Sequence, residues 1–300
     1  MIHGFLNLSK PAGMSSHDCV SRTRRLLGMK KVGHGGTLDP KATGVLPIGL
    51  GHGTRFLNYL PTQKAYKATI RFGVQTSTDD LEGDVVVRKS AKALGLAQIK
   101  LQLPTFIGNI MQVPPKFSAI QIDGKRQYQL ARKGVAVDIP ARSVKIDGID
   151  ILEWRNEGSD HPELVIAITC GPGTYIRSIA RDLGQKVGYG ATLAYLERTL
   201  SCGFHLNDSL SFEELEAQIT QNRFKAIPFN QALVGLPTFQ LDEAYTRRWY
   251  FGQRLPFEYE HTGEEPCPLY LKSFEETPLG IGWFQDGVLS PKVVIPKAES

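Results

Sequence analysis

The chain has 300 residues, 41% of them hydrophobic and 22% charged, which is enough to bury a sizeable core in one large domain or two. Its formal net charge of +5 suits a polyanionic partner without demanding one. The four cysteines form no CxxC pair, no apolar run is long enough to span a bilayer, and the first residues lack a signal peptide's basic start and apolar core. We therefore expect a soluble cytoplasmic protein with reduced thiols, without a zinc site or a disulfide framework, and without membrane association.

The first predicted element is a short helix in SSHDCVSRTRRLLG, residues 15–28. Ser15 or Ser16 can cap its start, and Gly28 can end it. Residues suited to a buried stripe recur at helical spacing at positions 20, 23, 26 and 27. The arginines on its other face are typical of a solvated helix surface.

Residues 33–47, GHGGTLDPKATGVLP, form a glycine-rich run that we expect to be a loop. It matches neither nucleotide-binding loop pattern, and no G-x-S-x-G elbow occurs. His34 and His52 lack partners at metal-ligand spacing, so we predict no metal site. What remains is Asp39, which Pro40 biases toward extended backbone while the glycines allow a ligand to approach closely. An aspartate that merely caps a turn is the alternative interpretation.

Alternation in YKATIRFGV predicts a half-buried strand, with positions 66, 68, 70 and 72 on one face and positions 67, 69 and 71 on the other. TSTDDLEGD, residues 76–84, predicts a polar turn. AKALGLAQIKLQL, residues 91–103, predicts a helix that Gly95 weakens. ELVIAITC, residues 163–170, predicts a strand with few polar residues.

The segment QVPPKFSAIQIDGKRQYQLARKG, residues 112–134, combines a proline pair, aromatic residues and basic residues. Basic charge interleaved with aromatic rings suits nucleic acid better than a small-molecule site. The basic residues are Lys116, Lys125, Arg126, Arg132 and Lys133.

A strand leads through a tight turn into a predicted helix in CGPGTYIRSIARDLG, residues 170–184, with an apolar stripe at positions 176, 179, 180 and 183. Tyr175 and Arg177 flank this stripe on opposite sides, so both can reach a cleft between helix and sheet. Arg177 can pair there with a buried carboxylate, holding it ionised and oriented. A surface arginine beside a core tyrosine is the alternative.

Strands and helices mix without regular βαβ alternation, so we predict an α+β fold with a mixed, largely antiparallel sheet flanked by helices. The composition changes near residue 237, where prolines and short strand-like pieces begin. We predict a main domain at residues 1–236, which the family resemblance described below implies to be catalytic, and a small β-rich domain at residues 237–300. A tail of this size is small for a core of its own, so we expect it to lean on the main domain.

Five stretches together resemble the TruB family of bacterial tRNA pseudouridine synthases, which act on uridine-55 of the T loop. They lie between about residues 5 and 205 and follow the family's order. They are LNLSKPAGMSSHD, KVGHGGTLDPKATGVLP, QVPPKFSAIQIDGKRQY, GTYIRSIARDLG and GATLAYLERT. The resemblance implies a pseudouridine synthase fold, an RNA-gripping insertion at about residues 104–140, and a PUA-like RNA-binding domain at residues 237–300, where RRWYFGQRLP matches best.

The resemblance also implies roles for single residues. Asp39 would be the catalytic aspartate, Arg177 its partner, and Tyr66 the ring that stacks on the target base and takes part in its proton transfer. One further residue would fill the space that the flipped-out nucleotide leaves, and two would line the uracil pocket. These are His34, and Tyr175 with Leu196.

The implied substrate is tRNA, bound through its T stem-loop by a monomeric, cytoplasmic enzyme that needs neither a guide RNA nor a cofactor. The chain departs from the family at Gly35, Gln121 and Glu197, where relatives often carry threonine, lysine and arginine. Lys125, Arg126 and Arg198 lie nearby in the sequence and can compensate for lost phosphate contacts.

Pseudouridine formation explains why a lone carboxylate is needed. The enzyme must break the N1–C1′ bond of a uridine, turn the base and rejoin it through C5, while positive charge develops at C1′. A fixed carboxylate can attack C1′ as in a retaining glycosidase, or remove the C2′ proton to give a glycal. Two alternatives remain from the sequence: a non-catalytic RNA-binding paralogue and a guide-dependent synthase of the dyskerin type.

Overall fold

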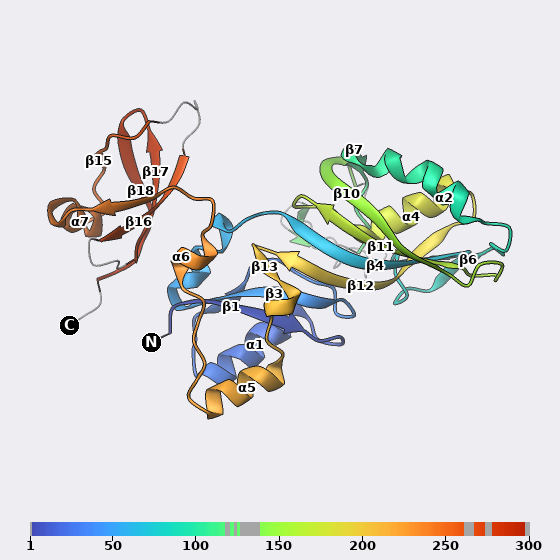
Figure 1. Cartoon of the computed structure of the whole chain (residues 1–300), viewed down its shortest axis with the longest axis horizontal. Coiled ribbons are helices and arrows are strands. Elements are labelled where there is room, and N and C mark those ends of the chain that lie inside the picture. The colour runs from blue at the N-terminus through green and yellow to red at the C-terminus, as the bar shows by residue number, and fades with distance from the viewer. Residues whose placement is uncertain are drawn as a thin grey trace.

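The structure is a computed structural model, and it describes residues 2–117, 121–122, 125–126, 139–260, 267–273 and 278–297. A long sheet of nine strands carries helices at both ends, and a second sheet of five strands follows toward the C-terminus (Figure 1). Within the described residues, no helix is both long enough and apolar enough to cross a membrane.

The nine-stranded sheet is mixed but mostly antiparallel, as predicted. Only the pair β12–β3 is parallel. In pairing order the strands are β1 (Gly4–Lys10), β3 (Thr43–Leu50), β12 (Ala191–Ser201), β4 (Lys64–Phe72), β11 (Glu163–Cys170), β10 (Arg142–Arg155) and β7 (Gly108–Gln112), with β2 (Val32–His34) beside β3 and β13 (Phe204–His205) beside β12.

Two pairs of helices bury opposite ends of this sheet. Near β1 and β3, α1 (Ser16–Leu27) lies beside α5 (Phe212–Thr220), and both contribute to one apolar cluster. Toward β10, α2 (Leu96–Gln102) and α4 (Ile176–Lys186) pack on a second cluster (Figure 1). Shorter helical pieces connect the strands: η1 (Gly51–Arg55), η2 (Leu57–Tyr59), η3 (Leu103–Phe106), η4 (Leu206–Asp208) and α6 (Phe229–Ala232).

Local sequence signals account for several of these elements. Helix α1 begins at a capping box between Ser15 and Asp18 and ends at Gly28, whose φ of 61° is left-handed. In β4 the predicted face is buried, and Lys67 on the other face is exposed. The stripe of α4 is buried as predicted.

Two helix boundaries differ from the prediction. Helix α2 starts only after Gly95, whose backbone N–H donates to the Gln98 side chain, so residues 91–94 form a turn. Tyr175 precedes α4 in an extended conformation instead of lying on the helix. The predicted polar turn joins β5 (Val74–Thr76) to β6 (Val85–Arg88), and β8 (Gln121–Ile122) pairs with β9 (Lys125–Arg126).

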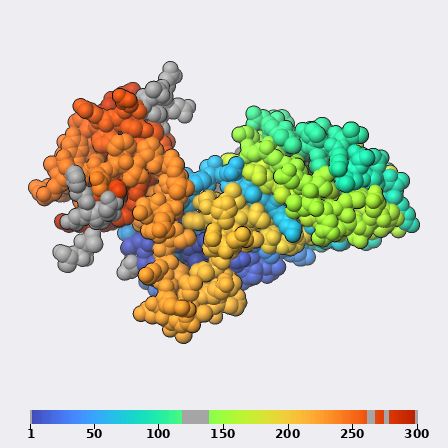
Figure 2. Space-filling view, in the orientation of Figure 1, coloured from blue at the N-terminus to red at the C-terminus, as the bar shows by residue number. Residues whose placement is uncertain are grey.

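The C-terminal β-rich unit is present as predicted and forms a rounded lobe at one end of the molecule (Figure 2). Tyr270, Ile281 and Val293 share a buried cluster with Phe5 and Phe56, so the unit leans on the rest of the chain. Its elements are β14 (Thr238–Leu241), α7 (Glu243–Tyr250), β15 (Leu255–Pro256), β16 (Cys267–Ser273), β17 (Pro278–Gln285) and β18 (Val288–Val294).

Candidate active site

Asp39 lies in the loop between β2 and β3, and two buried polar side chains hold this loop. The ammonium of Lys10 donates to the carbonyl oxygen of Pro40 at 2.9 Å. The hydroxyl of Ser16 accepts from the backbone N–H of Leu38 at 2.8 Å and lies 3.2 Å from its carbonyl oxygen, to which it can donate. The Asp39 backbone is therefore fastened on both sides.

Arg198 anchors the start of the same loop from β12. Its guanidinium donates to the carbonyl oxygens of Gly36 at 3.1 Å, Thr37 at 3.3 Å and Val45 at 2.8 Å. The residue is fully buried. The expectation that Arg198 compensates for a lost phosphate contact is therefore wrong, because its donors are turned inward to the backbone.

Arg177 grips the Asp39 carboxylate with two nitrogens. Its Nε lies 3.0 Å from Oδ2, and its NH2 group donates to Oδ1 at 3.2 Å. The same guanidinium donates to the carbonyl oxygens of Thr78 at 3.2 Å and Phe117 at 3.1 Å, and it lies 3.5 Å from the Asp80 carboxylate. The Arg177 side chain is 7% exposed and that of Asp39 is 38% exposed, so the arginine lies beneath and the carboxylate faces the open side.

The charges around Asp39 compete. Burial raises the pKa of the Asp39 carboxyl and Asp80 adds to the rise, while Arg177 and Lys10 oppose it. Because an arginine fork favours the ionised form and fixes its plane, Asp39 is oriented as a carboxylate toward whatever enters beside it.

A cavity of about 180 Å³ opens next to Asp39. It is smaller than typical drug-sized pockets of about 300–1,000 Å³, which suits one flat ring better than a large cofactor. Two aromatic rings and several aliphatic groups face the carboxylate there. The lining residues are Thr37, Leu38, Asp39, Lys64, Tyr66, Gly173, Thr174, Tyr175, Ile176, Arg177 and Leu196.

Tyr66 is the buried ring of this pocket. Burial raises the pKa of its hydroxyl, which Arg198 on the paired strand counteracts in part. The neutral phenol is thus the form present at neutral pH. A neutral ring is suited to stacking on a base, and its hydroxyl can donate a proton rather than accept one.

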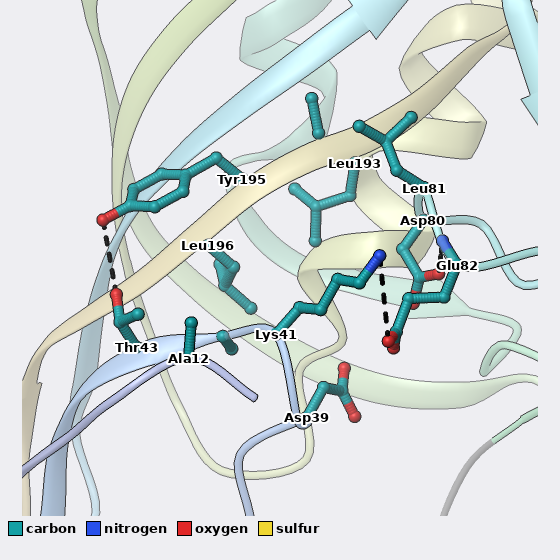
Figure 3. Close-up of a pocket in the computed structure, with 12 residues that line it drawn as sticks. Ala12, Asp39, Lys41, Thr43, Asp80, Leu81, Glu82, Leu193, Tyr195 and Leu196 are labelled. Atoms are coloured by element: carbon teal, nitrogen blue, oxygen red, sulfur yellow. Dashed lines mark hydrogen bonds and ion pairs between the residues drawn. The ribbon is translucent and has the colours of Figure 1, made fainter. Parts of the chain in front are cut away.

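Figure 3 shows a second cavity, of about 250 Å³, that shares Asp39 and Leu196 with the first. Lys41 and Glu82 face each other across it at 4.0 Å, and Tyr195 lies at one side. The smaller cavity is the stronger candidate for a reaction site, because Asp39, Arg177 and both Tyr66 and Tyr175 line it.

Tyr175 is fixed through its backbone by a buried glutamine. Gln112 accepts from the Tyr175 N–H at 2.8 Å and donates to the Tyr175 carbonyl at 3.1 Å. Ser178 and Arg181 both donate to the carbonyl of Val113 at 2.9 Å. The start of α4 is thereby tied to the residues that lead into the basic segment.

His34 lies apart from the two cavities. Its Nδ1 accepts from the Gly36 N–H at 3.3 Å, and burial, with a smaller effect of Arg198, lowers its pKa. The structure thus places His34 at the end of β2, just before the loop that carries Asp39, but not among the residues that line either cavity.

The predicted basic segment is described only in part. Lys116 is exposed. Lys125 and Arg126 form β9, but their side chains lie outside the described residues, and so do Arg132 and Lys133 entirely. RNA binding by these residues stays a prediction.

Sequence reasoning missed four side chains that shape the site: Lys10, Asp80, Gln112 and the inward-facing Arg198. Lys10 and Gln112 stand within LNLSKPAGMSSHD and QVPPKFSAIQIDGKRQY, and Asp80 belongs to the polar turn. For Lys10 the available signal was a charged side chain directly before a proline, and for Gln112 an amide side chain in a strand; Asp80 and Arg198 carried no such signal. A polar side chain in such a place needs a buried partner.

Comparison with known proteins gives one consistent result. Residues 24–176 match the family model described as TruB family pseudouridylate synthase (N terminal domain). A protein of Nostoc sp. named tRNA pseudouridine synthase B is 51% identical over 98% of both chains. A protein of Gloeobacter violaceus with the same name is 46% identical over 98% of this chain and 99% of its own.

Solved structures show the same fold at lower identity. One chain in a crystal structure of a Cbf5–Nop10–Gar1 complex is 24% identical, with a TM-score of 0.72 over 98% of this chain and 85% of its own. Another, from an H/ACA RNP bound to a substrate RNA containing 2′-deoxyuridine, is 21% identical with a TM-score of 0.71 over 99% and 86% of the two chains. These likenesses concern the fold alone.

Proposed function

Since the chain belongs to the TruB family of pseudouridylate synthases and is a tRNA pseudouridine synthase, an isomerase, we propose that it converts uridine-55 in the T loop of tRNA to pseudouridine. In this proposal Asp39 is the catalytic carboxylate. The observation that carries the proposal is the arginine fork on Asp39 at the edge of a cavity with two tyrosines.

The chemistry starts from ionised Asp39. A carboxylate held in one plane by Arg177 can approach the ribose of a nucleotide whose base has entered the cavity. It either attacks C1′ or takes the C2′ proton, and both routes release uracil inside the pocket. C5 of the rotated base then bonds to C1′, which either breaks the Asp39–C1′ ester bond or adds the base to the glycal as C2′ regains its proton. C5 loses its proton and N1 gains one, so that no atom is gained or lost overall.

The detached base must stay in the pocket until it rejoins the ribose. Stacking on Tyr66 supplies about 1–3 kcal/mol. Tyr175 and Leu196 close the remaining sides. His34, at the end of β2 just before the loop that holds Asp39, fills the gap that base flipping leaves in the RNA.

The domains divide the work. Residues 1–236 carry the catalytic site, and the segment at about residues 104–140 grips the RNA. Residues 237–300 act as a PUA-like RNA-binding domain. This part holds ten acidic and six basic residues, so the positive charge of the chain lies in residues 1–236. The tail then binds RNA through specific contacts rather than by net charge.

We propose a monomeric, cytoplasmic enzyme that reads the T stem-loop without a guide RNA. The test is to incubate the protein alone with a short T stem-loop transcript and to map pseudouridine. We expect one modified uridine, less binding as salt rises, and no reaction when cytidine replaces the target. A guided enzyme would need added RNA and proteins, and a pure binding protein would modify nothing. Either result would refute the proposal.

A further inference from the structure

The reaction pocket contains a cation to which the proposed mechanism assigns no role. Lys64 is the first residue of β4, and since side chains alternate along a strand it shares a face with Tyr66. Both line the cavity beside Asp39. Tyr66 is buried, whereas Lys64 is only half-buried. Lys64 is therefore more accessible to solvent than the ring beside it.

Lys64 lacks the partners that the neighbouring cations have. Arg198 and Lys10 donate to backbone carbonyls, and Arg177 to a carboxylate. No hydrogen bond or ion pair to the Lys64 ammonium occurs within the described part of the chain. A half-buried cation without a counter-charge is costly in the free protein, and this cost is relieved when an anion binds.

The surroundings of Lys64 add positive charge instead of neutralising it. A Cβ placed on Gly36 would lie 3.6 Å from a guanidinium nitrogen of Arg198 and 3.8 Å from the Lys64 Nζ, so both cations converge on the loop that carries Asp39. Burial lowers the pKa of Lys64 and Arg198 lowers it further. The loop side of the cavity is thus prepared for an anion.

We propose that Lys64 binds a phosphate directly next to the target uridine and thereby positions its ribose over Asp39. This inference rests on the proposed function. The base occupies the aromatic part of the cavity, so the phosphates of the flipped nucleotide stay toward solvent, to which Lys64 is accessible. A lysine ammonium is a compact charge that suits a phosphate approached from one side.

The test compares Lys64→Met with Lys67→Met, a matched control on the same strand whose exposed side chain points to the other face. Binding of the T stem-loop is measured over a range of salt concentrations in an Asp39→Asn background, so that the target remains a uridine. We expect Lys64→Met to weaken binding about ten-fold. The slope of the logarithm of the binding constant against the logarithm of the salt concentration should become shallower by about 0.7, the value for one phosphate contact with a single strand. Lys67→Met should leave both quantities nearly unchanged.

A second measurement identifies the phosphate. Stem-loops with a neutral methylphosphonate on the 5′ or the 3′ side of the target are bound to both proteins. One of the two should weaken binding to the lysine protein about ten-fold and have little effect on Lys64→Met. This substitution in the RNA also tests the contact without any change to the protein fold, and Lys64→Met should melt no lower than its parent.

The proposal is overturned if Lys64→Met binds the stem-loop with unchanged affinity and unchanged salt dependence. It is also overturned if neither methylphosphonate removes the difference in affinity between the lysine protein and Lys64→Met. A variant that binds normally but is slow in single turnover with Asp39 restored would also overturn it, since Lys64 would then act on the base. Failure of the otherwise unchanged protein to modify the stem-loop would defeat the proposed function instead, so the two failures are distinct.

Discussion

Replacing Arg177 by lysine tests the geometry of the site while it keeps the charge. The guanidinium meets both oxygens of Asp39, at 3.0 and 3.2 Å, and the carbonyls of Thr78 and Phe117, at 3.2 and 3.1 Å. A lysine has one nitrogen on a chain of similar length, so it can replace at most a part of these contacts.

The magnitude follows from the contacts that are lost. Each buried carbonyl left without a donor costs about 1–3 kcal/mol, so we expect Arg177→Lys to lose about 2 kcal/mol or more of unfolding free energy. Loss of the fork also frees the Asp39 carboxylate to turn. Misplacement of a catalytic group by about 1 Å costs about 100-fold in rate, and we expect a single-turnover rate lower by about that factor.

The assay is single-turnover isomerisation of a T stem-loop at saturating protein, together with thermal unfolding. Arg181→Lys is the matched control, one turn further along α4. Arg181 pairs with Asp79 at 2.9 Å and Asp182 at 2.8 Å but has no contact with Asp39. It should lose stability and keep its rate within a few-fold. Near wild-type turnover by Arg177→Lys, or an equal slowing in Arg181→Lys, would refute the orienting role of the fork.

Three further outcomes follow from the same site. Burial raises the pKa of Asp39, so the folded chain binds a proton on this carboxyl more tightly than the unfolded chain does. Keeping the carboxylate ionised at pH 7 therefore lowers the free energy of unfolding. Asp39→Asn should abolish turnover, and at pH 7 its melting temperature should equal or exceed that of the wild type. This difference in melting temperature should shrink as the pH falls through the raised pKa of Asp39; a clearly lower melting temperature of the variant at pH 7 would contradict this. Because Asp80 helps to raise the pKa of Asp39, Asp80→Asn should move the acid limb of the pH–rate profile to lower pH, and a limb that stays or rises would count against the coupling. Gln112→Met should leave the Tyr175 N–H without its acceptor and take one of two donors from the Tyr175 carbonyl, which keeps the Ile179 N–H at 3.3 Å. We expect a cost of about 1–3 kcal/mol in denaturant unfolding and a lower rate at saturating RNA; full stability would show that the glutamine does not hold Tyr175.

Much of the local structure is predictable from the sequence because short-range physics determines it. A serine three residues before an aspartate starts α1, and strict alternation makes β4 a strand with one buried face. The same alternation places Lys64 and Tyr66 on one side. The strands β1 and β3 carry no such alternation, since they are buried on nearly every residue, and they were not predicted.

The family resemblance singled out Asp39 and Arg177, and the residue types alone already suggested that a buried carboxylate needs an arginine. Their meeting is a tertiary event between positions 138 residues apart. The periodicity of the sequence cannot predict this contact, because the contact depends on how α4 is placed relative to the loop between β2 and β3.

The sequence by itself therefore determined several of the elements, the fold class and the family, all of which depend on short patterns and on motifs in order. Only the tertiary structure decided how each charged side chain is used. Arg198 resembles a surface arginine in LERT, but it is fully buried and donates to the loop carbonyls of Gly36 and Thr37. Lys64 resembles any lysine at a strand start, but it lines the cavity beside Asp39 and has no hydrogen-bond or ion-pair partner among the described residues. The free energy of a charge depends on which groups surround it in space, and those groups come from distant parts of the chain.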